Sequence, residues 1–354
     1  MPHPEKGLRR PHLTAVSTTK PLQEGLFHNR KGKTHEAPSF HPGLRVVAGR
    51  RVAGPGPGPR HPYRRAFRAG GSADLIPRLI AGALAERLGQ SVIVENRPGA
   101  GGAVGALHVS RAAPDGLTLG VATVSTHAIQ PAVSARPGYQ PLRDFSPISN
   151  LADVPNIVSI NPRLPAANLV EFVALARRKD GDLMFGSPGV GSLGHMMGEL
   201  LVQTTGARLR HVPYRGAGPA LQDAIAGHVD VLCDNLPASL PHVLGGRLRA
   251  LAVAWPGRVA QLPDVPTFSE AGIPALNDPA WFGLVGPAGM PPALVAALQE
   301  AVVAALKRPE VAARIVELGA VPRANAPEEF SRQIGAELEK WRSVAKRANI
   351  SLEA

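Results

Sequence analysis

From residue 69 onward, short apolar segments alternate with segments of helical spacing, and this alternation constrains the fold more than any other feature of the sequence. Strands are expected at 91–95, 117–122, 155–160, 183–187, 229–233, 248–254 and 281–285. Helices are expected at 74–88, 102–112, 169–179, 191–206, 219–227, 292–307, 309–318 and 327–348. Such alternation is typical of α/β proteins with mainly parallel sheets. Their ligands bind at the carboxyl ends of the strands, beside the N-termini of helices.

The net charge of +12 belongs to the first part of the chain. Residues 1–68 hold 14 Lys and Arg against 3 Asp and Glu, which gives +11, whereas residues 69–354 hold 25 against 24, which gives +1. The first 65 residues are poor in apolar side chains and alternate Gly with Pro over 54–59. We therefore expect 1–65 to be a disordered basic tail. It lacks the interleaved aromatic residues of a nucleic-acid arm, so no nucleic-acid partner is expected.

Composition excludes several other classes of protein. No uninterrupted apolar run reaches about 18 residues, which argues against a transmembrane helix. The single cysteine, Cys233, excludes an internal disulfide framework and a Cys-rich metal site. No apolar stretch of about 7–15 residues follows a basic start, so no secretory signal peptide is visible. Taken as written, the chain would be cytoplasmic.

Two glycine-rich turns, at 69–74 and 186–193, each precede an expected helix. Glycine lets the backbone approach a ligand closely, and the first N–H groups of a helix favour an anion. Ser72 and Ser192 could donate a hydroxyl to that anion or cap their helices. Either turn alone could also be an ordinary capped turn, and a phosphate would use the same physics as a carboxylate.

Enzyme motifs around these turns are incomplete. Val104 breaks the G-x-G-x-x-G spacing of a dinucleotide-binding loop. Neither Ser187 nor Ser192 sits in G-x-S-x-G. His195 and Glu199 are one helical turn apart, but no further metal ligands accompany them. We expect no catalytic residue, no metal and no cofactor; the alternative is an α/β enzyme that acts on a phosphorylated or nucleotide-like anion.

Eight short signatures give residues 66–354 a resemblance to a known family. They are AGGSAD at 69–74, VENRPGAGG at 94–102, APDGLTL at 113–119, STHAI at 125–129, SPGVGS at 187–192, HVPYRG at 211–216, LPDVPT at 262–267 and WFGL at 281–284. Their order resembles the Bug family of periplasmic solute-binding receptors, which serve tripartite tricarboxylate transporters. The resemblance implies a two-lobed, type II periplasmic-binding-protein fold that closes like a Venus flytrap. Lobe 1 would span 66–153 and 289–354, and lobe 2 would span 154–288.

The resemblance also implies a set of ligand-binding residues, in which main-chain N–H groups and waters from the two glycine-rich loops hold the ligand's carboxylates. One wall would comprise Gly70, Gly71, Ser72, Ala73 and Asp74; a second Ser187, Gly189, Val190, Gly191 and Ser192; a third Ser125 and Thr126; and the floor Tyr214 and Asp234. Asp74 could instead cap its helix, or bind a cationic group such as an amino acid's ammonium. Tyr214 and Asp234 could equally form a structural hydrogen-bonded pair.

The implied ligand is a small carboxylate: a di- or tricarboxylate, or an acidic amino acid. The implied protein is a periplasmic monomer whose partners are the membrane components of a tripartite tricarboxylate-type transporter. Family members begin with a signal peptide and an apolar strand that leads into the A-G-G loop, whereas this chain has HPYRRAF at 61–67. A central parallel strand is normally rich in Val and Ile and free of Pro. The residues upstream of Ala66 could therefore be a non-native N-terminus.

Overall fold

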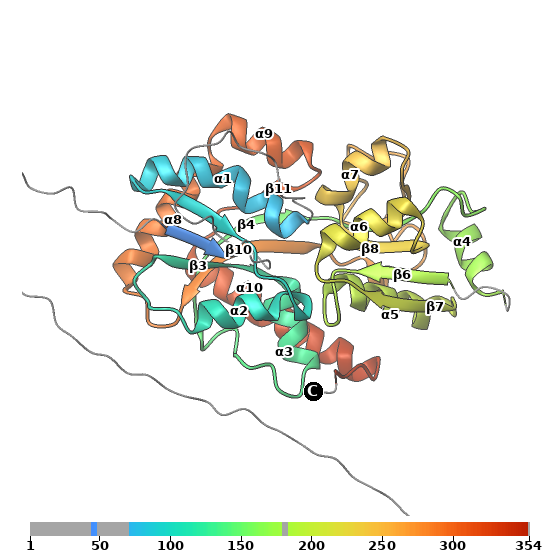
Figure 1. The fold of residues 1–354 in the computed structure, drawn as a ribbon, viewed down its shortest axis with the longest axis horizontal. Helices are drawn as coiled ribbons and strands as arrows, with labels where there is room; N and C mark the ends of the chain where they lie inside the picture. Colours follow the sequence, from blue (N-terminus) through green and yellow to red (C-terminus); the bar gives the residue numbers. More distant parts are fainter. Residues whose placement is uncertain (1–43, 48–70, 179–182, 353–354) are drawn as a thin grey trace, which may run out of the picture. The chain divides into compact units, whose positions relative to one another are not determined.

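A computed structural model describes residues 44–47, 71–178 and 183–352, and these form two β-sheets covered by helices (Figure 1). The first sheet has the order β11-β4-β10-β3-β1-β2 and the second has the order β7-β6-β8-β5-β9. The strands of the first sheet are β1 (Leu44–Val47), β2 (Val92–Glu95), β3 (Thr118–Thr123), β4 (Phe145–Val154), β10 (Ala280–Pro287) and β11 (Val321–Pro322). Those of the second are β5 (Asn156–Ile160), β6 (Leu183–Ser187), β7 (Leu209–Pro213), β8 (Val231–Asn235) and β9 (Arg249–Ala254).

The α/β class is confirmed, but the prediction of mainly parallel sheets is wrong in detail. The pairs β1–β2, β1–β3, β6–β7 and β6–β8 are parallel, whereas β3–β10, β4–β10, β4–β11, β5–β8 and β5–β9 are antiparallel. The cause lies in how the chain changes sheets. Only Pro155 separates β4 from β5, so no crossover helix returns the chain to the start of a parallel strand.

The chain passes from the first sheet to the second between β4 and β5, and it returns between β9 and β10. A boundary drawn by sheet membership therefore lies after Val154 and before Ala280. The first sheet then includes β10, which pairs with both β3 and β4. The division of the chain into lobes that move as units stays a prediction.

β1 differs from what the sequence suggested. Leu44–Val47 lies between β2 and β3, with Val46 opposite Val94 and Leu119. This strand falls inside the segment expected to be disordered. It takes a central position in the sheet, whereas the sequence analysis looked for the family's first strand at 61–67 and found that segment unsuited to a central strand. Leu-Arg-Val-Val supplies β-branched residues, as a central parallel strand requires. The rest of the expectation for the first 65 residues lies outside the described part of the chain.

Most helices lie where the apolar spacing predicts them: α1 (Ser72–Leu88), α2 (Ala103–Ser110), α4 (Leu169–Ala176), α5 (Leu193–Thr205), α6 (Ala217–Ala226), α8 (Pro292–Leu306), α9 (Pro309–Glu317) and α10 (Pro327–Arg347). The sequence analysis missed α3 (Gln130–Val133), α7 (Leu236–Leu244) and the short helices η1 (Ala100–Gly102), η2 (Ser125–Ile129) and η3 (Pro274–Leu276). Both α3 and α7 have a proline within their first two positions, where proline is compatible with a helix. The same proline interrupts the helical spacing of apolar residues from which the other helices were predicted.

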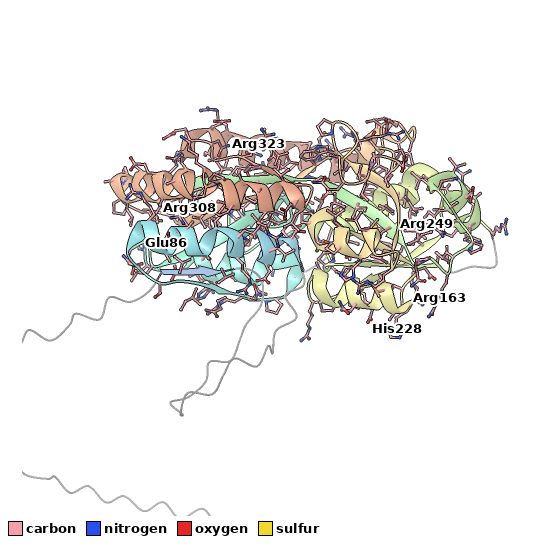
Figure 2. The ribbon with its side chains drawn as sticks, turned by 90° about the horizontal axis from the view of Figure 1, so that it is seen from above. Glu86, Arg163, His228, Arg249, Arg308 and Arg323 are labelled. Carbon is pink, nitrogen blue, oxygen red and sulfur yellow. The ribbon has the colours of Figure 1, made fainter. Side chains whose placement is uncertain are left out.

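The C-terminal helices pack against the elements of the first sheet. α8 and α9 contact α1, and α10 contacts η2, α3 and β4. Arg308, the N-cap of α9, pairs with Glu86 of α1 at 2.6 Å between Nη2 and Oε2 (Figure 2). Because this pair is solvent-exposed, apolar packing rather than the ion pair holds these helices in place. None of the helices in the described part is long and apolar enough to cross a bilayer.

Candidate functional site

A cavity of about 170 Å³ lies between the two sheets. Residues at or just past the carboxyl ends of strands line it: Asn96 after β2, Thr123 in β3, Pro188 after β6, Arg215 after β7 and Asn235 in β8. This is where α/β sheets bind ligands. A cavity of about 150 Å³ can hold benzene, so this cavity suits a ligand of roughly that size.

Five helices begin at this cavity. The wall includes the starts of α1 (Gly71, Ser72, Ala73, Asp74), α2 (Gly101, Gly102), α5 (Ser192, Leu193), α6 (Gly216, Ala217, Gly218, Pro219) and α7 (Asn235). Each helix N-terminus presents N–H groups and the positive end of the helix dipole. Helix starts that converge in this way favour the binding of an anion.

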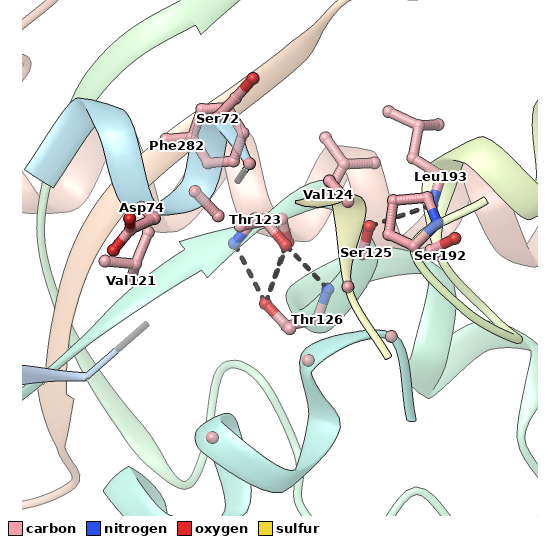
Figure 3. A pocket seen from close by; sticks show the side chains of 18 of the residues that line it. Ser72, Asp74, Val121, Thr123, Val124, Ser125, Thr126, Ser192, Leu193 and Phe282 are labelled. Carbon is pink, nitrogen blue, oxygen red and sulfur yellow. Dashed lines mark hydrogen bonds between the residues drawn. The ribbon is translucent and has the colours of Figure 1, made fainter. Parts of the chain in front are cut away.

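The N–H groups of the α5 terminus already have partners in the protein. The N–H of Gly191 donates to Nδ1 of His195 at 3.2 Å, and that of Ser192 to the carbonyl oxygen of Gly189 at 3.1 Å. The N–H of Leu193 donates to Oγ of Ser125 at 3.0 Å (Figure 3). The N–H groups of Gly191, Ser192 and Leu193 therefore already donate to acceptors within the protein.

The starts of α1 and α6 differ from that of α5. The N–H groups of Ser72, Ala73, Ala217 and Gly218 have no partner among the described residues. The two starts approach each other closely, since a Cβ atom at Gly71 would lie 2.9 Å from Cβ of Ala217. α1 packs beside the first sheet and α6 beside the second. We call each sheet with the helices packed on it one half of the molecule, so an anion between the two helix starts would contact both halves.

The structure brings some of the predicted site residues to the cavity and leaves others behind its wall. Those on the wall are Gly71, Ser72, Ala73, Asp74, Ser125, Thr126, Ser192 and Asp234. Those that do not line it are Ser187, Gly189, Val190, Gly191 and Tyr214. Gly70 lies outside the described residues. Ligand contact by any of these residues stays a prediction.

The residues behind the wall have structural partners. Ser187 is fully buried, and its Oγ lies 2.7 Å from Nε2 of His211. Tyr214 donates from its hydroxyl to Oδ2 of Asp223 at 2.8 Å. The structural pair considered for Tyr214 thus exists, but with Asp223 instead of Asp234.

Gln130 joins the two halves of the molecule beside the cavity. Its Nε2 donates to the carbonyl oxygen of Ala100 at 3.0 Å and to that of Val190 at 2.9 Å. Ala100 belongs to the first half and Val190 to the second. Together with the contact between Ser125 and Leu193, this bridge connects the two halves directly beside the cavity.

Several wall residues were missed by the sequence analysis, namely Asn96, Thr123, Arg215, Gly216, Ala217, Gly218, Pro219, Asn235, Trp281 and Phe282. Gly216, directly before α6, and Gly218, its second residue, were an available signal for the α6 start. Thr123 exchanges hydrogen bonds with Thr126: each backbone N–H donates to the other's Oγ1 (Figure 3). This exchange shapes the turn between β3 and η2.

Two carboxylates on the wall are incompletely paired. Asp74 accepts from Nε of Arg78 and from Nδ2 of Asn96 through Oδ1, both at 2.8 Å, but its buried Oδ2 has no partner among the described residues. Asp234 is 3% exposed, and neither of its carboxylate oxygens has a hydrogen-bond partner among the described residues. Burial raises the pKa of Asp234 to about 7, an effect that the neighbouring backbone N–H of Asn235 partly offsets.

The described residues contain no group of three or more His, Cys, Asp and Glu side chains placed to share a metal ion. Burial raises the pKa of the Cys233 thiol, which keeps it protonated and unreactive. The Ser187 hydroxyl contacts His211, but it has no exposed surface and lies outside the cavity wall. This arrangement suits binding rather than nucleophilic catalysis.

Replacing His127 with phenylalanine should make the protein more resistant to acid. His127 is buried beside Phe145 and Tyr139, and burial lowers its pKa to about 3. The unfolded chain takes up a proton near pH 6.5 and the folded chain does not, so this group costs stability as pH falls from 6.5 towards 3. The loss is about 1.4 kcal/mol per pH unit over that window.

The measurement is the difference in unfolding free energy between His127→Phe and the parent protein at pH 7.5 and pH 4.5, without ligand. The difference should move by about 2–3 kcal/mol in favour of the variant at the lower pH. Taking a difference cancels the opposite contribution of Asp234, whose raised pKa stabilises the folded state as pH falls below about 7. Parallel pH profiles would show that His127 is protonated in the folded protein.

Comparisons with known proteins agree on one family. Residues 76–350 match the family model described as the tripartite tricarboxylate transporter family receptor, TctC. BugT of Bordetella pertussis is 34% identical over 289 residues, which cover 81% of this chain and 88% of that protein.

Two similar solved structures contain small acids. An R. palustris protein solved with adipate has a TM-score of 0.79 and 34% identity, covering 88% of this chain and 98% of its own. MatC from Rhodopseudomonas palustris, with bound malate, has a TM-score of 0.77 and 33% identity, and the match covers 85% of this chain and 98% of MatC. The two-lobed periplasmic-binding-protein fold expected from the sequence is confirmed.

Proposed function

This chain belongs to the tripartite tricarboxylate transporter receptor family, and from that premise we propose that its cavity captures a small carboxylate between the starts of α1 and α6. The family consists of solute-binding receptors, so the chain is a receptor and not an enzyme. Receptors of this family are periplasmic. We place this protein there too, as a monomer that delivers its ligand to the membrane components of such a transporter.

The observation that carries the proposal is the opposed pair of helix starts. Ser72 and Ala73 on one side and Ala217 and Gly218 on the other offer backbone N–H groups that have no partner among the described residues. Backbone N–H groups at helix starts suit a carboxylate. The adipate and malate found in the two R. palustris relatives support this ligand class. Arg215, exposed at the rim, adds a positive charge.

A thermal-shift screen tests the proposal. We expect at least one mono-, di- or tricarboxylate or acidic amino acid to raise the melting temperature, since a ligand at 100 times its Kd stabilises the folded state by about 2.7 kcal/mol. Titration calorimetry should then give one site per chain, and the ligand should be recovered unchanged. Inorganic phosphate and a nucleoside monophosphate are the controls. Stabilisation by those two alone, with no carboxylate active, would overturn the proposal.

Replacing Gly71 with alanine should weaken carboxylate binding by roughly one to two orders of magnitude. The φ of Gly71 is −142°, which any residue adopts, so the substitution introduces no backbone strain. Its Cβ would lie 2.9 Å from Cβ of Ala217 across the cavity, and overpacking of this kind costs about 1–3 kcal/mol. The contact exists only when the two halves are closed, so we expect binding to fall without a loss of melting temperature.

Gly82→Ala is the matched control for this variant. Gly82 lies in the same helix, and a Cβ atom there would meet no atom within 4 Å. Calorimetry should give Gly82→Ala the parent affinity. Equal affinities for both variants would mean that the α1 and α6 starts stay apart in the bound state.

A further inference from the structure

The chain crosses between the two sheets twice, at Pro155 and over residues 255–279. We propose that Asn156 is a positioning residue that joins these two crossings to each other and thereby fixes the axis about which the halves rotate. It also holds Asn235 of the cavity wall, so the wall and the axis are positioned by the same side chain. Asn156 acts on the motion of the halves, whatever the cavity binds, and this role goes beyond the proposed function.

The backbone ladder is interrupted where the chain crosses between the sheets. In the first sheet the β4–β10 ladder ends at the pair of Val154 with Ala280, and in the second the β5–β9 ladder begins at Asn156. Between them lies Pro155, which has no N–H group to donate. Its carbonyl oxygen accepts from the N–H of Leu236 at 2.9 Å. A side chain is therefore needed to bond the first crossing to the second.

The side-chain amide of Asn156 makes this bond. Its Nδ2 donates to the carbonyl oxygen of Asp278, two residues before β10, at 2.6 Å. Its Oδ1 accepts from Nδ2 of Asn235, the residue opposite it on β8, at 2.5 Å. Asn156 is fully buried, and hydrogen bonds shielded from water are stronger than exposed ones. One amide thus connects both crossings and the cavity wall.

The second crossing is also anchored to each half. The carboxylate of Asp278 pairs with Nζ of Lys340 at 2.6 Å, and Lys340 lies in α10, which packs on β4 of the first sheet. Asn277 bonds both backbone groups of Trp255, the residue after β9 of the second sheet, at 2.9 and 3.2 Å. Hinges are formed by a few residues at the ends of elements, and the bond between Asn156 and Asp278 lies where both crossings meet. Without it, we expect the halves to rotate about more than one axis.

Pulsed electron spin resonance on the ligand-free protein tests this role. Spin labels are attached at Ile93→Cys in β2 of the first sheet and at Val170→Cys in α4, beside the second sheet; both positions are exposed (Figure 1). Cys233 is fully buried and stays unlabelled. Asn156→Ala should broaden the distribution of distances between the labels relative to the parent protein. Its melting temperature should also fall, because two buried hydrogen bonds are lost.

Asn161→Ala is the matched control. Asn161 is a buried asparagine just after the other end of β5, and its Nδ2 donates to the carbonyl oxygens of Ala224 and Ile225 within the second half. This variant should lower the melting temperature but keep the parent distribution of distances. A parent-like distribution in Asn156→Ala, or equal broadening in both variants, would overturn the role of Asn156 and leave the proposed function intact. Should an alanine variant fail to fold, Asn156→Ser and Asn161→Ser repeat the comparison, because serine keeps a buried hydroxyl but is too short to reach the carbonyl oxygen of Asp278.

Discussion

Replacing Gly191 with valine should abolish measurable ligand binding and leave the protein folded. Gly191 has a φ of +72°, a conformation that a β-branched residue adopts only with strain. A Cβ atom there would lie 2.2 Å from Nε2 of Gln130 and 2.8 Å from Cδ1 of Leu352. The valine would therefore displace Gln130 from the carbonyl oxygens of Ala100 and Val190.

The expected loss of affinity is large because several costs add. Overpacking costs about 1–3 kcal/mol, and each of the two hydrogen bonds made by Gln130 contributes about 0.5–1.5 kcal/mol. Their sum corresponds to roughly two to four orders of magnitude in Kd. Gln130 and Leu352 belong to the half built on the first sheet and Gly191 to the half built on the second, so we expect this clash to arise when the two halves close.

Gly206→Val separates closure from backbone strain. Gly206 also has a positive φ, of +68°, but it caps the opposite end of α5, where a Cβ atom would meet only Nε of Arg177 at 3.8 Å. Both variants should lower the melting temperature, whereas only Gly191→Val should lose binding in calorimetry. Parent-like affinity in Gly191→Val would mean that the bridge made by Gln130 is not part of the ligand-bound state.

Gly191 shows which properties of the candidate site could be predicted from the sequence and which could not. Its place in a glycine-rich turn before a helix singles it out, and the structure confirms that this position needs a glycine. The sequence suggested that a ligand lies against it, and that contact stays a prediction; in the structure, the nearest atoms to a Cβ at this position come from Gln130 and Leu352. These partners lie 61 and 161 positions away in the chain. Local spacing carries no information about contacts of that range.

The same limit explains the errors in the fold. β4 was missed because Ser, Pro, Asn and Asp interrupt its ten residues, although most of the strand is buried. Its neighbours β10 and β11 come from distant parts of the chain, and pairing with them forms the strand regardless of its weak local pattern. β3 and β6 have continuous apolar patterns and were predicted within one residue of their observed bounds.

The candidate site was only partly predictable for a related reason. The α1 start was found because its glycines and Ser72 precede a strongly apolar helix. The α6 start was not among the glycine-rich turns singled out in the sequence, although Gly216 and Gly218 mark it. Whether two turns face each other depends on how the sheets are placed, as the approach of Gly71 to Ala217 shows.

Replacing Phe330 with alanine should lower the free energy of unfolding by about 3–5 kcal/mol, which is a large part of the 5–15 kcal/mol typical of a folded protein. Phe330 of α10 is fully buried, and its ring meets that of Trp281 edge-on, with 5.3 Å between ring centroids. The ring covers Gly283 of β10, where a Cβ atom would lie 2.0 Å from Cζ of Phe330. Denaturant unfolding without ligand measures the loss.

Gly283→Ala makes this test specific to the contact between α10 and β10. In the parent protein its methyl group collides with the Phe330 ring, so the single variant should lose about 1–3 kcal/mol. In the Phe330→Ala background the same methyl group enters the space left by the ring, so there it should be neutral or stabilising. The double-mutant cycle should therefore give a coupling energy of at least about 1 kcal/mol. Additive losses would mean that α10 does not pack on β10 at this position, and the contact that joins the C-terminal helix to the cavity-lining strand would have to be reassigned.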